Sequence, residues 1–307
     1  MNGLFFAFAN SLTALALCIV VGFVCRRQRL LNDVHMAGMA EVLVKVAIPC
    51  TIFIALMRPF SRELMFESLA TFAITGVIYI LGGYLGLFLA RLMKATPGEK
   101  EAWHFGCSFG NIGFMGIPVV MAVFGEDGLI YVSMAAASFT FLSFTVGVRM
   151  FSNAPREIRF LRLMRNSPAV PATIIGFIMF LTELRLPSPL EGGIDLINGM
   201  TTPLSMILIG AILAKQRLKD SLTDVRVLPV TFVKLVLIPL VSLLVLRWFI
   251  PNPLMLSVIV TLMAMPPAAT TAIFAEQYEG DAVSAAKFVV VPTILCAVTV
   301  PLIALLL

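Results

Sequence analysis

The amino-acid sequence predicts an all-α polytopic membrane protein with ten transmembrane helices, arranged as two inverted repeats of five helices each. Composition is the first indication: 60% of the 307 residues are hydrophobic and 13% are charged, against about 25% charged residues in soluble domains. The mean hydropathy of +1.00 agrees with this. Ten apolar stretches and a pattern repeated at one offset are the other two indications. The net charge of +5 is small, and the basic residues are distributed according to the predicted sides of the membrane. No nucleic-acid partner is therefore expected.

The ten predicted spans come from a hydropathy window of about 19 residues. They cover residues 3–24, 36–57, 66–90, 102–124, 128–150, 168–184, 192–213, 227–249, 253–276 and 282–306. The sixth span is short, and the fourth and ninth are interrupted by glycine and proline. We expect the first to stay in the membrane rather than act as a cleaved signal, because no basic residue precedes it.

The basic residues predict the orientation of these spans. With the N-terminus outside, the inside loops hold fifteen lysines and arginines and the outside loops hold four. The inside residues are Arg26, Arg27, Arg29, Arg91, Lys94, Lys100, Arg149, Arg156, Arg159, Arg162, Arg165, Lys215, Arg217, Lys219 and Arg226. The outside residues are Arg58, Arg62, Arg185 and Arg247. The positive-inside rule therefore places both termini outside, in a protein of the cytoplasmic (inner) membrane.

The chain repeats itself at an offset of 154 residues. Pro49 and Pro203 each lie midway along an apolar run, and Gly22-Phe23 matches Gly176-Phe177. Asp127 and Asp281 each precede the last span of a half, and Asn111-Ile112-Gly113 falls opposite Met265-Pro266-Pro267. The halves are residues 1–155 and 156–307, joined near Arg156–Ser167. Because five spans is an odd number, the two halves must insert with opposite orientation, which is a transporter architecture.

Two spans cannot be continuous helices. In the fourth, Asn111–Pro118 contains an asparagine, two glycines and a proline; in the ninth, Met265 is followed by Pro266 and Pro267. In a helix interior each glycine costs about 1 kcal/mol and each proline about 3 kcal/mol relative to alanine. Broken helices persist at bilayer depth only when they are buried in protein or line a cavity. We therefore predict that the two breaks cross and form a binding site, with Pro118, Pro266 and Pro267 near the start of each new helix.

The motifs around these breaks resemble those of the auxin efflux carrier family. They are Asn111-x-Gly-Phe-Met-Gly-x-Pro118, Ala264-Met265-Pro266, Ala275-Glu276-Gln277-Tyr278 and Pro203…Leu208-Ile209-Gly210-Ala211. The resemblance covers essentially the whole chain. The chain looks like a compact prokaryotic member of the family, because the joint between its halves lacks the long central loop of plant auxin carriers. The resemblance implies a fold related to the bile-acid/sodium symporters. It also implies a scaffold domain from spans 1, 2, 6 and 7, a transport domain from spans 3–5 and 8–10, elevator motion, and a homodimer through the scaffold.

The predicted substrate-binding residues surround the two breaks: Asn111, Gly113, Gly116, Pro118, Met265, Pro266, Pro267, Thr270 and Thr271. The Asn111 amide supplies donors and an acceptor without charge, although it could instead satisfy its own broken helix. The glycines allow close backbone approach or simple helix packing. The threonine hydroxyls could face substrate or bond back to their own helix.

Ionisable residues within or at the ends of spans are further candidates for ion coupling or ion pairing. They are Glu41, Lys45, Lys234, Glu276 and Lys287. Glu41 and Lys45 have the spacing of a helix-surface ion pair. Glu276 is expected at the inner surface, His104 at the membrane interface, and Asp127 and Asp281 at helix N-caps. The five cysteines have no paired or metal-ligand spacing, so no metal or cofactor is expected.

These observations favour a secondary transporter of small organic anions, either auxin-like indole acids or carboxylates such as malonate or malate. A sodium-coupled symporter of the bile-acid type is the alternative, but the broken spans offer few oxygen ligands beyond Asn111. A membrane sensor that binds without transport is a second alternative. The sequence contains no H-E-x-x-H motif and no pair of membrane-embedded aspartates suited to proteolysis, so no enzyme is expected.

Overall fold

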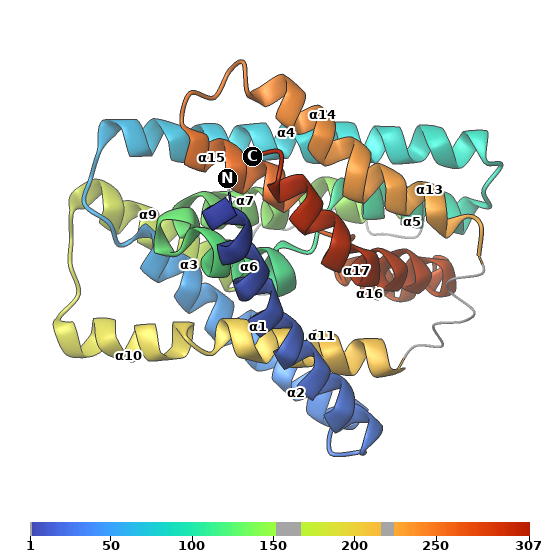
Figure 1. Ribbon diagram of the computed structural model, residues 1–307, viewed down its shortest axis with the longest axis horizontal. Coiled ribbons are helices and arrows are strands. Elements are labelled where there is room, and N and C mark those ends of the chain that lie inside the picture. The colour runs from blue at the N-terminus through green and yellow to red at the C-terminus, as the bar shows by residue number, and fades with distance from the viewer. Residues whose placement is uncertain (1, 152–166, 216–223) are drawn as a thin grey trace. The chain divides into compact units, whose positions relative to one another are not determined.

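The computed structural model describes residues 2–151, 167–215 and 224–307 (Figure 1). Within these residues the chain is almost entirely helical, and its β pairing is an isolated bridge between Gly110 and Pro267. The described chain forms two compact units, called unit 1 and unit 2 below. Of the described residues, unit 1 comprises 2–72, 113–140 and 167–215, and unit 2 comprises 73–112, 141–151 and 224–307. The predicted joint between the halves lies mostly outside the described residues.

Six helical segments of the described chain are long and apolar enough to cross a membrane. They are Asp33–Leu56, Arg62–Leu92, Glu126–Met150, Ser188–Ala214, Val227–Leu246 and Ala282–Ala304. Ile112–Phe124, Ala169–Thr182 and Pro253–Met263 are shorter apolar helices. A multi-helix membrane protein without a sheet in its described part is thereby confirmed, whereas the ten-span inverted topology stays a prediction.

Unit 1 is built from helices of both halves of the sequence. From the first half come α1 (Asn2–Arg27), α2 (Asp33–Val42), the π-helical turn η1 (Leu43–Ala47), α3 (Ile48–Leu56), the start of α4 (Arg62–Leu92), most of the π turn η2 (Ile112–Gly116), α6 (Ile117–Phe124), the 3-10 turn η3 (Glu126–Gly128) and α7 (Leu129–Leu142). From the second half come α9 (Ala169–Thr182), α10 (Ser188–Asn198) and α11 (Thr201–Lys215).

Two contacts hold unit 1 together at helix crossings. Helix α1 crosses α11 (Figure 1) with backbone against backbone at Gly22 and Gly210, where neither helix has a side chain to keep the two apart. Helix α3 packs on α9 and α10. Helix α3 also contacts α11 through two buried hydroxyls: Thr51, in α3, and Thr201, at the start of α11, are 2.8 Å apart and share a hydrogen bond. These two hydroxyls therefore satisfy each other at the crossing.

Unit 2 contains the remaining described elements. They are the rest of α4, α5 (Pro97–Ser108), the π turn η4 (Ser143–Gly147), the 3-10 turn η5 (Val148–Met150), α13 (Val227–Phe232), the π turn η6 (Val233–Leu237), α14 (Ile238–Leu246), α15 (Pro253–Met263), α16 (Thr270–Gln277) and α17 (Ala282–Ala304). Its core includes an aromatic cluster in which Phe105 stacks against Phe109, Phe151 and Phe274 at centroid distances of 4.7, 5.7 and 5.3 Å.

Three of the π turns precede a proline at the same spacing. Turns η1, η2 and η6 end two residues before Pro49, Pro118 and Pro239. A proline ring has no N–H to donate and clashes with the carbonyl four residues earlier, so a wider turn relieves the contact. Proline alone does not force such a turn, because α17 contains Pro292 and Pro301 without one. π turns in membrane helices often mark functional positions.

Candidate functional site

The two predicted breaks lie side by side in unit 2. Helix α5 ends at Ser108 and the chain is non-helical until Ile112, while α15 ends at Met263 and α16 begins at Thr270. The Asn111 N–H donates to the Pro266 carbonyl at 2.7 Å, and the Ala268 N–H donates to the Phe109 carbonyl at 2.9 Å. Backbone groups freed by one break are therefore satisfied by the other, as a water-free environment requires.

The exact positions of the helix starts differ from the prediction. The first break covers Phe109–Asn111, and the helix resumes at Ile112, before Gly113 and Pro118. In the second break, α16 begins three residues after Pro267, so neither proline is its first residue. The physical reason is that Met265 and Pro266 each precede a proline, which biases both residues away from helical backbone angles. The Ala268 N–H also donates to the Phe109 carbonyl of the other break, and α16 begins beyond this contact, at Thr270.

The predicted substrate-binding residues divide between the two units. Asn111, Met265, Pro266, Pro267, Thr270 and Thr271 lie in unit 2, around the paired breaks, and Gly113, Gly116 and Pro118 lie in unit 1. Asn111 is 5% exposed and Met265 is fully buried. The paired breaks therefore form a closed, protein-lined region, to which both broken helices contribute backbone and polar side chains.

Several hydroxyl groups beside the breaks are buried without a hydrogen-bond partner. They belong to Ser108, at the end of α5, and to Thr270 and Thr271, in the first turn of α16. The threonines do not bond back to their own helix, which was the alternative considered for them. Ser108 was not identified from the sequence, although it is the central residue of Gly106-Cys107-Ser108-Phe109-Gly110, which marks the position just before the first break. Unsatisfied buried hydroxyls are unfavourable and are normally paired with protein or ordered water.

Lys234 is a further polar group beside the first break. It lies in the π turn η6 and is 1% exposed. A Cβ atom placed on Gly110 would be 3.4 Å from its Nζ atom, so the absence of a side chain at Gly110 leaves room for the ammonium group. The structure thus brings together Lys234 and the paired breaks, which are far apart in the sequence.

The other ionisable candidates have ordinary surroundings. Lys45 forms an exposed ion pair with Glu41, as the spacing predicted. Lys287 pairs with Asp224 at 2.8 Å, and Glu276 is exposed at the end of α16. These residues are therefore placed in ion pairs or at the surface.

Predictions for the remaining polar residues had mixed outcomes. The Asp281 carboxylate caps α17 by accepting a hydrogen bond from the Ser284 N–H at 2.9 Å, as expected. Asp127 instead lies inside the turn η3, where Arg58 donates to its carboxylate at 2.7 Å. The nearby guanidinium is a contact that the sequence pattern does not reveal. The His104 ring is half-buried beside Tyr84, at a centroid distance of 5.8 Å.

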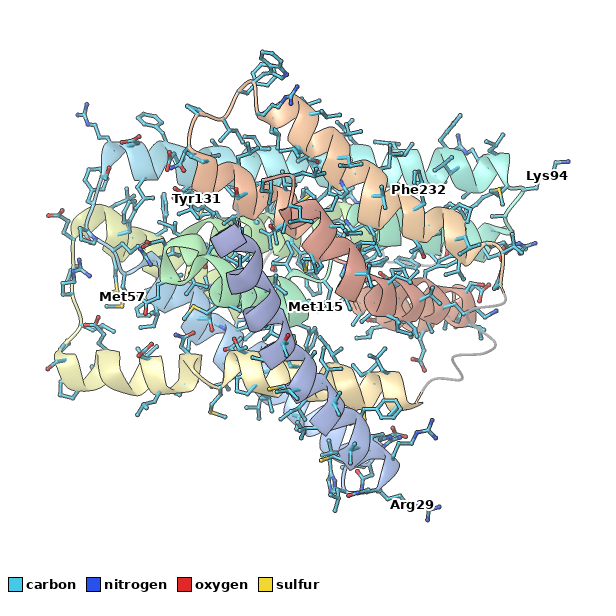
Figure 2. The ribbon with its side chains drawn as sticks, viewed as in Figure 1. Arg29, Met57, Lys94, Met115, Tyr131 and Phe232 are labelled. Atoms are coloured by element: carbon cyan, nitrogen blue, oxygen red, sulfur yellow. The ribbon has the colours of Figure 1, made fainter. Side chains whose placement is uncertain are left out.

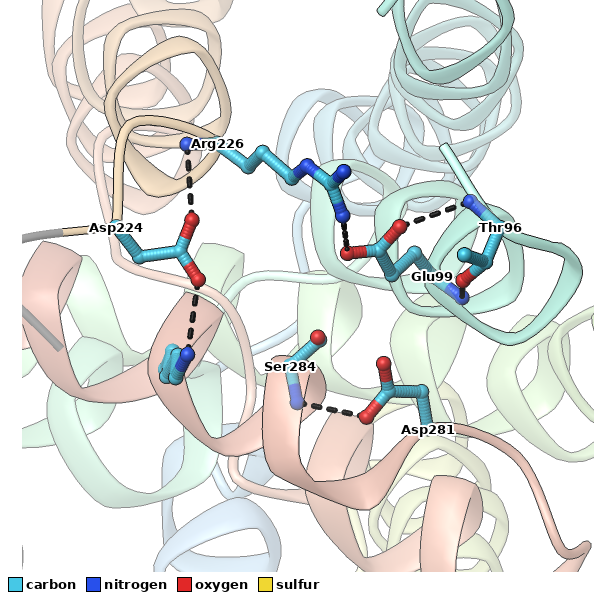
Figure 3. A network of polar contacts seen from close by, with 7 residues as sticks. Thr96, Glu99, Asp224, Arg226, Asp281 and Ser284 are labelled. Carbon is cyan, nitrogen blue, oxygen red and sulfur yellow. Dashed lines mark hydrogen bonds and ion pairs between the residues drawn. The ribbon is translucent and has the colours of Figure 1, made fainter. Parts of the chain in front are cut away.

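A polar network joins the start of α5 to α17 and to the segment just before α13, all within unit 2 (Figure 3). Glu99 completes a capping box with Thr96 at the start of α5 and also accepts a hydrogen bond from Arg226. Asp224 accepts hydrogen bonds from the Arg226 backbone N–H at 3.1 Å and from Lys287 at 2.8 Å. Three separate parts of the chain, at residues 96–99, 224–226 and 287, are joined by these bonds.

This network lowers the pKa of both carboxyl groups. Burial of Glu99 by itself would raise its pKa, but the Thr96 backbone N–H and the Arg226 guanidinium outweigh burial and lower the pKa below 4.5. For Asp224 the main cause of the lowered pKa is the hydrogen bond from Lys287. A carboxyl whose pKa is lower in the folded state stabilises the fold above its unfolded pKa, and that stability is lost as the pH falls.

We expect Glu99→Gln to lower the stability of the protein at pH 7 by about 1–3 kcal/mol, because a charge-assisted network with a buried carboxylate is lost. The difference from the parent should shrink as the pH falls below the ordinary carboxyl pKa of 4.5, because the unfolded chain then binds a proton that folded Glu99, with its lowered pKa, still resists. Thermal unfolding in detergent between pH 7 and pH 3.5 measures both effects. Glu63→Gln, at an exposed carboxylate in the first turn of α4, is the matched control and should behave like the parent. Equal losses in both variants would contradict the role of the network.

The sequence also matches known proteins over nearly its full length. A family model described as membrane transport protein matches residues 7–161 and 156–304. An uncharacterised transporter of Methanothermobacter thermautotrophicus is 24% identical over 307 residues, covering 97% of this chain and 98% of the relative.

Two further relatives are also transporters by name. An uncharacterised transporter of Methanocaldococcus jannaschii is 26% identical over 209 residues, covering 66% of this chain and 67% of its own. A protein of Rhizobium meliloti whose name marks it as a candidate malonate transporter is 25% identical over 277 residues, covering 86% of this chain and 85% of its own. The family match, which covers almost the whole chain, shows that the protein belongs to the membrane transport protein family, that of the auxin efflux carriers.

Proposed function

We propose that this protein is a secondary transporter of small organic anions, which binds its substrate at the paired breaks of the fourth and ninth spans. The candidate substrates are auxin-like indole acids and carboxylates such as malonate or malate. The observation that carries the proposal is the hydrogen-bonded pairing of two broken helices around Gly110 and Pro267. Ligands of inverted-repeat transporters bind between discontinuous helices near the middle of the membrane.

The chemistry of the paired breaks supports an anionic substrate. New helices begin at Ile112 and Thr270, and a helix start carries a partial positive charge that favours a nearby anion. Buried hydroxyls of Thr270 and Thr271 are available as donors. The similarity to a candidate malonate transporter adds independent support for a carboxylate.

Energetics favour export without a coupling ion. Moving one negative charge out of a cell that is negative inside is downhill by about 2.3 kcal/mol per 100 mV. Uptake of the same anion would need coupling. The proposed arrangement has both termini outside the cytoplasmic (inner) membrane, on the basis of the positive-inside rule.

We further propose an elevator mechanism, in which a scaffold domain stays fixed and a transport domain carries the substrate. Unit 1 holds the helices of spans 1, 2, 6 and 7, and unit 2 holds those of spans 8–10. Helices α6 and α7 cluster with unit 1, so the border of the moving part stays a prediction. A homodimer through the scaffold domain is likewise a prediction.

Counterflow of radiolabelled acid in proteoliposomes tests the proposed function. Vesicles loaded with malonate, malate or indole-3-acetate should accumulate the same labelled acid against empty-vesicle controls, with or without sodium. Strict sodium dependence would instead establish the bile-acid type of symport. Binding of an acid without any flux would establish a sensor, and the transport proposal would then be wrong.

Asn111→Ala should reduce the flux of whichever acid is transported by about 10-fold or more, since a lost hydrogen bond to a charged group costs about 1.5–3 kcal/mol. Initial rates in the same vesicles, normalised to the amount of inserted protein, measure this. Asn252→Ala is a suitable comparison, because Asn252 caps the start of α15, at the opposite end of that helix from the second break. If Asn111→Ala transports at the parental rate, the proposed contact is wrong.

A further inference from the structure

The buried position of Lys234 is unusual for a lysine in a membrane span. It lies in the π turn η6, within the apolar segment Val227–Leu246, and is 1% exposed. Phe232, two residues earlier, points outward (Figure 2) and is 57% exposed. Lys234 therefore faces the interior of unit 2 and does not extend toward the membrane surface as lysines near helix ends do.

The acidic groups of unit 2 do not neutralise this lysine. In its described part they are Glu99, Glu101, Asp224, Glu276, Glu279 and Asp281, all at helix ends or in loops. Glu99 pairs with Arg226 and Asp224 pairs with Lys287. No carboxylate of the described chain forms an ion pair with Lys234. A buried ammonium without a counter-charge is strongly unfavourable, so Lys234 calls for an anion that the described part of the chain does not supply.

The surroundings of Lys234 locate where such a partner would bind. A Cβ atom on Gly110 would be 3.4 Å from Lys234 Nζ and 3.3 Å from the Leu262 carbonyl oxygen. Gly110 is the residue that pairs with Pro267 between the two breaks. The ammonium group is therefore beside the paired breaks, on the side where the first break has no side chain.

We propose that Lys234 is the cationic group that binds a carboxylate of the transported anion at the paired breaks. This inference rests on the proposed function and adds to it a substrate class: acids with at least one ionised carboxylate that is stripped of water in the site. Neutral analogues of the same size leave the ammonium uncompensated and do not bind. Lysine suits this task because it acts as a compact point charge with rotatable donors, whereas a bidentate arginine holds an anion in a fixed geometry.

A structural role for Lys234 predicts a different result from a binding role. If the lysine stabilised the empty protein, its removal would lower the melting temperature. If it serves an anion, its removal takes away an uncompensated buried charge, and the empty protein melts at the same or a higher temperature. Only in the second case does the stabilisation by added anion disappear.

The test uses the purified full chain with acetate, malonate, malate and indole-3-acetate as probes, malonamide as the neutral analogue of malonate, and chloride to balance ionic strength. The variants are Lys234→Met, Lys234→Gln and Lys234→Arg. Lys94→Met is the matched control, since Lys94 is exposed in the turn after α4 and its side chain points away from the helices (Figure 2). Thermal shift and proteoliposome uptake of each labelled acid are measured for all of them.

We expect at least one acid, and not malonamide, to raise the melting temperature of the parent and of Lys94→Met. Lys234→Met and Lys234→Gln should lose that shift and at least 10-fold of the uptake, with no lower melting temperature when empty, while Lys234→Arg keeps part of both. Uptake by either neutral variant within twofold of the parent would overturn the inference and leave the proposed function intact. The inference would also be overturned, with the proposed function intact, if the empty variants melted at a lower temperature than the parent and still showed the anion-induced shift. A parent that neither binds nor transports any of the acids overturns the proposed function itself.

Discussion

Gly22→Ala should be among the most destabilising single-methyl additions in this protein. A Cβ atom at Gly22 would be 1.9 Å from the carbonyl oxygen of Ile207, and one at Gly210 would be 1.9 Å from that of Ile19. Carbon atoms in contact are normally about 3.5–4.0 Å apart. Because both obstacles are backbone atoms within helices, no side-chain rotation can relieve the contact. Helices α1 and α11 would have to separate along their whole crossing.

We expect Gly22→Ala and Gly210→Ala each to cost about 3 kcal/mol or more, the upper end of the range for overpacking. Thermal unfolding in detergent, together with the monodisperse fraction on size-exclusion chromatography, measures the loss. Small residues at helix crossings allow this close approach in membranes, where apolar side chains gain nothing by leaving lipid. The crossing is therefore held by backbone contact, which any side chain would remove.

Two other glycines provide graded controls for this prediction. An added Cβ at Gly176 would be 3.1 Å from the Leu56 side chain and 3.6 Å from the Phe53 Cα atom, distances much longer than 1.9 Å, so Gly176→Ala should show a smaller loss. Gly38 lies in α2 with nothing within 4 Å, and Gly38→Ala should gain up to about 1 kcal/mol from helix propensity. If all four glycines respond alike, general helix flexibility rather than close packing explains the effect.

The existence of both breaks could be predicted from the sequence, but their limits could not. Glycine, asparagine and proline inside apolar runs carry a local cost that a sequence displays directly. Where the helix resumes depends on two further effects: the extended backbone favoured before Pro266 and Pro267, and the two hydrogen bonds between the breaks, Asn111 with Pro266 and Ala268 with Phe109. The second effect joins segments that are distant in the chain, and no local pattern contains it.

The surroundings of Lys234 could not be predicted from the sequence either, because they depend on contacts between distant parts of the chain. Its spacing from Gly110 follows from how η6 packs on the first break, and the sequence gives no sign of that contact. Local pairs were accessible: Glu41 and Lys45 are one helical turn apart, and Asp281 precedes an apolar run. Distant pairs, such as Arg58 with Asp127 and Glu99 with Arg226, were not.

Gly110→Val should abolish most transport, because it fills the space between the first break and Lys234. The Cβ atom alone would be 3.3 Å from the Leu262 carbonyl oxygen and 3.4 Å from Lys234 Nζ, and valine adds two methyl groups beyond it. Relief requires either a shift of the paired breaks or displacement of the ammonium group. Overpacking costs about 1–3 kcal/mol, which corresponds to roughly 5–150-fold in rate if the transport-competent geometry bears the cost.

Initial uptake rates per inserted protein measure this effect, and Gly106→Ala is its matched control on α5. A Cβ at Gly106 would meet Pro267 at 3.6 Å and Thr271 at 3.7 Å, which are ordinary contacts, so this variant should transport within about threefold of the parent. Gly110→Ala should lie between the two. A Gly110→Val variant that transports normally would mean that the space beside Gly110 is not used by substrate. The binding of the anion would then have to be sought away from the paired breaks, since Lys234 approaches them at this glycine.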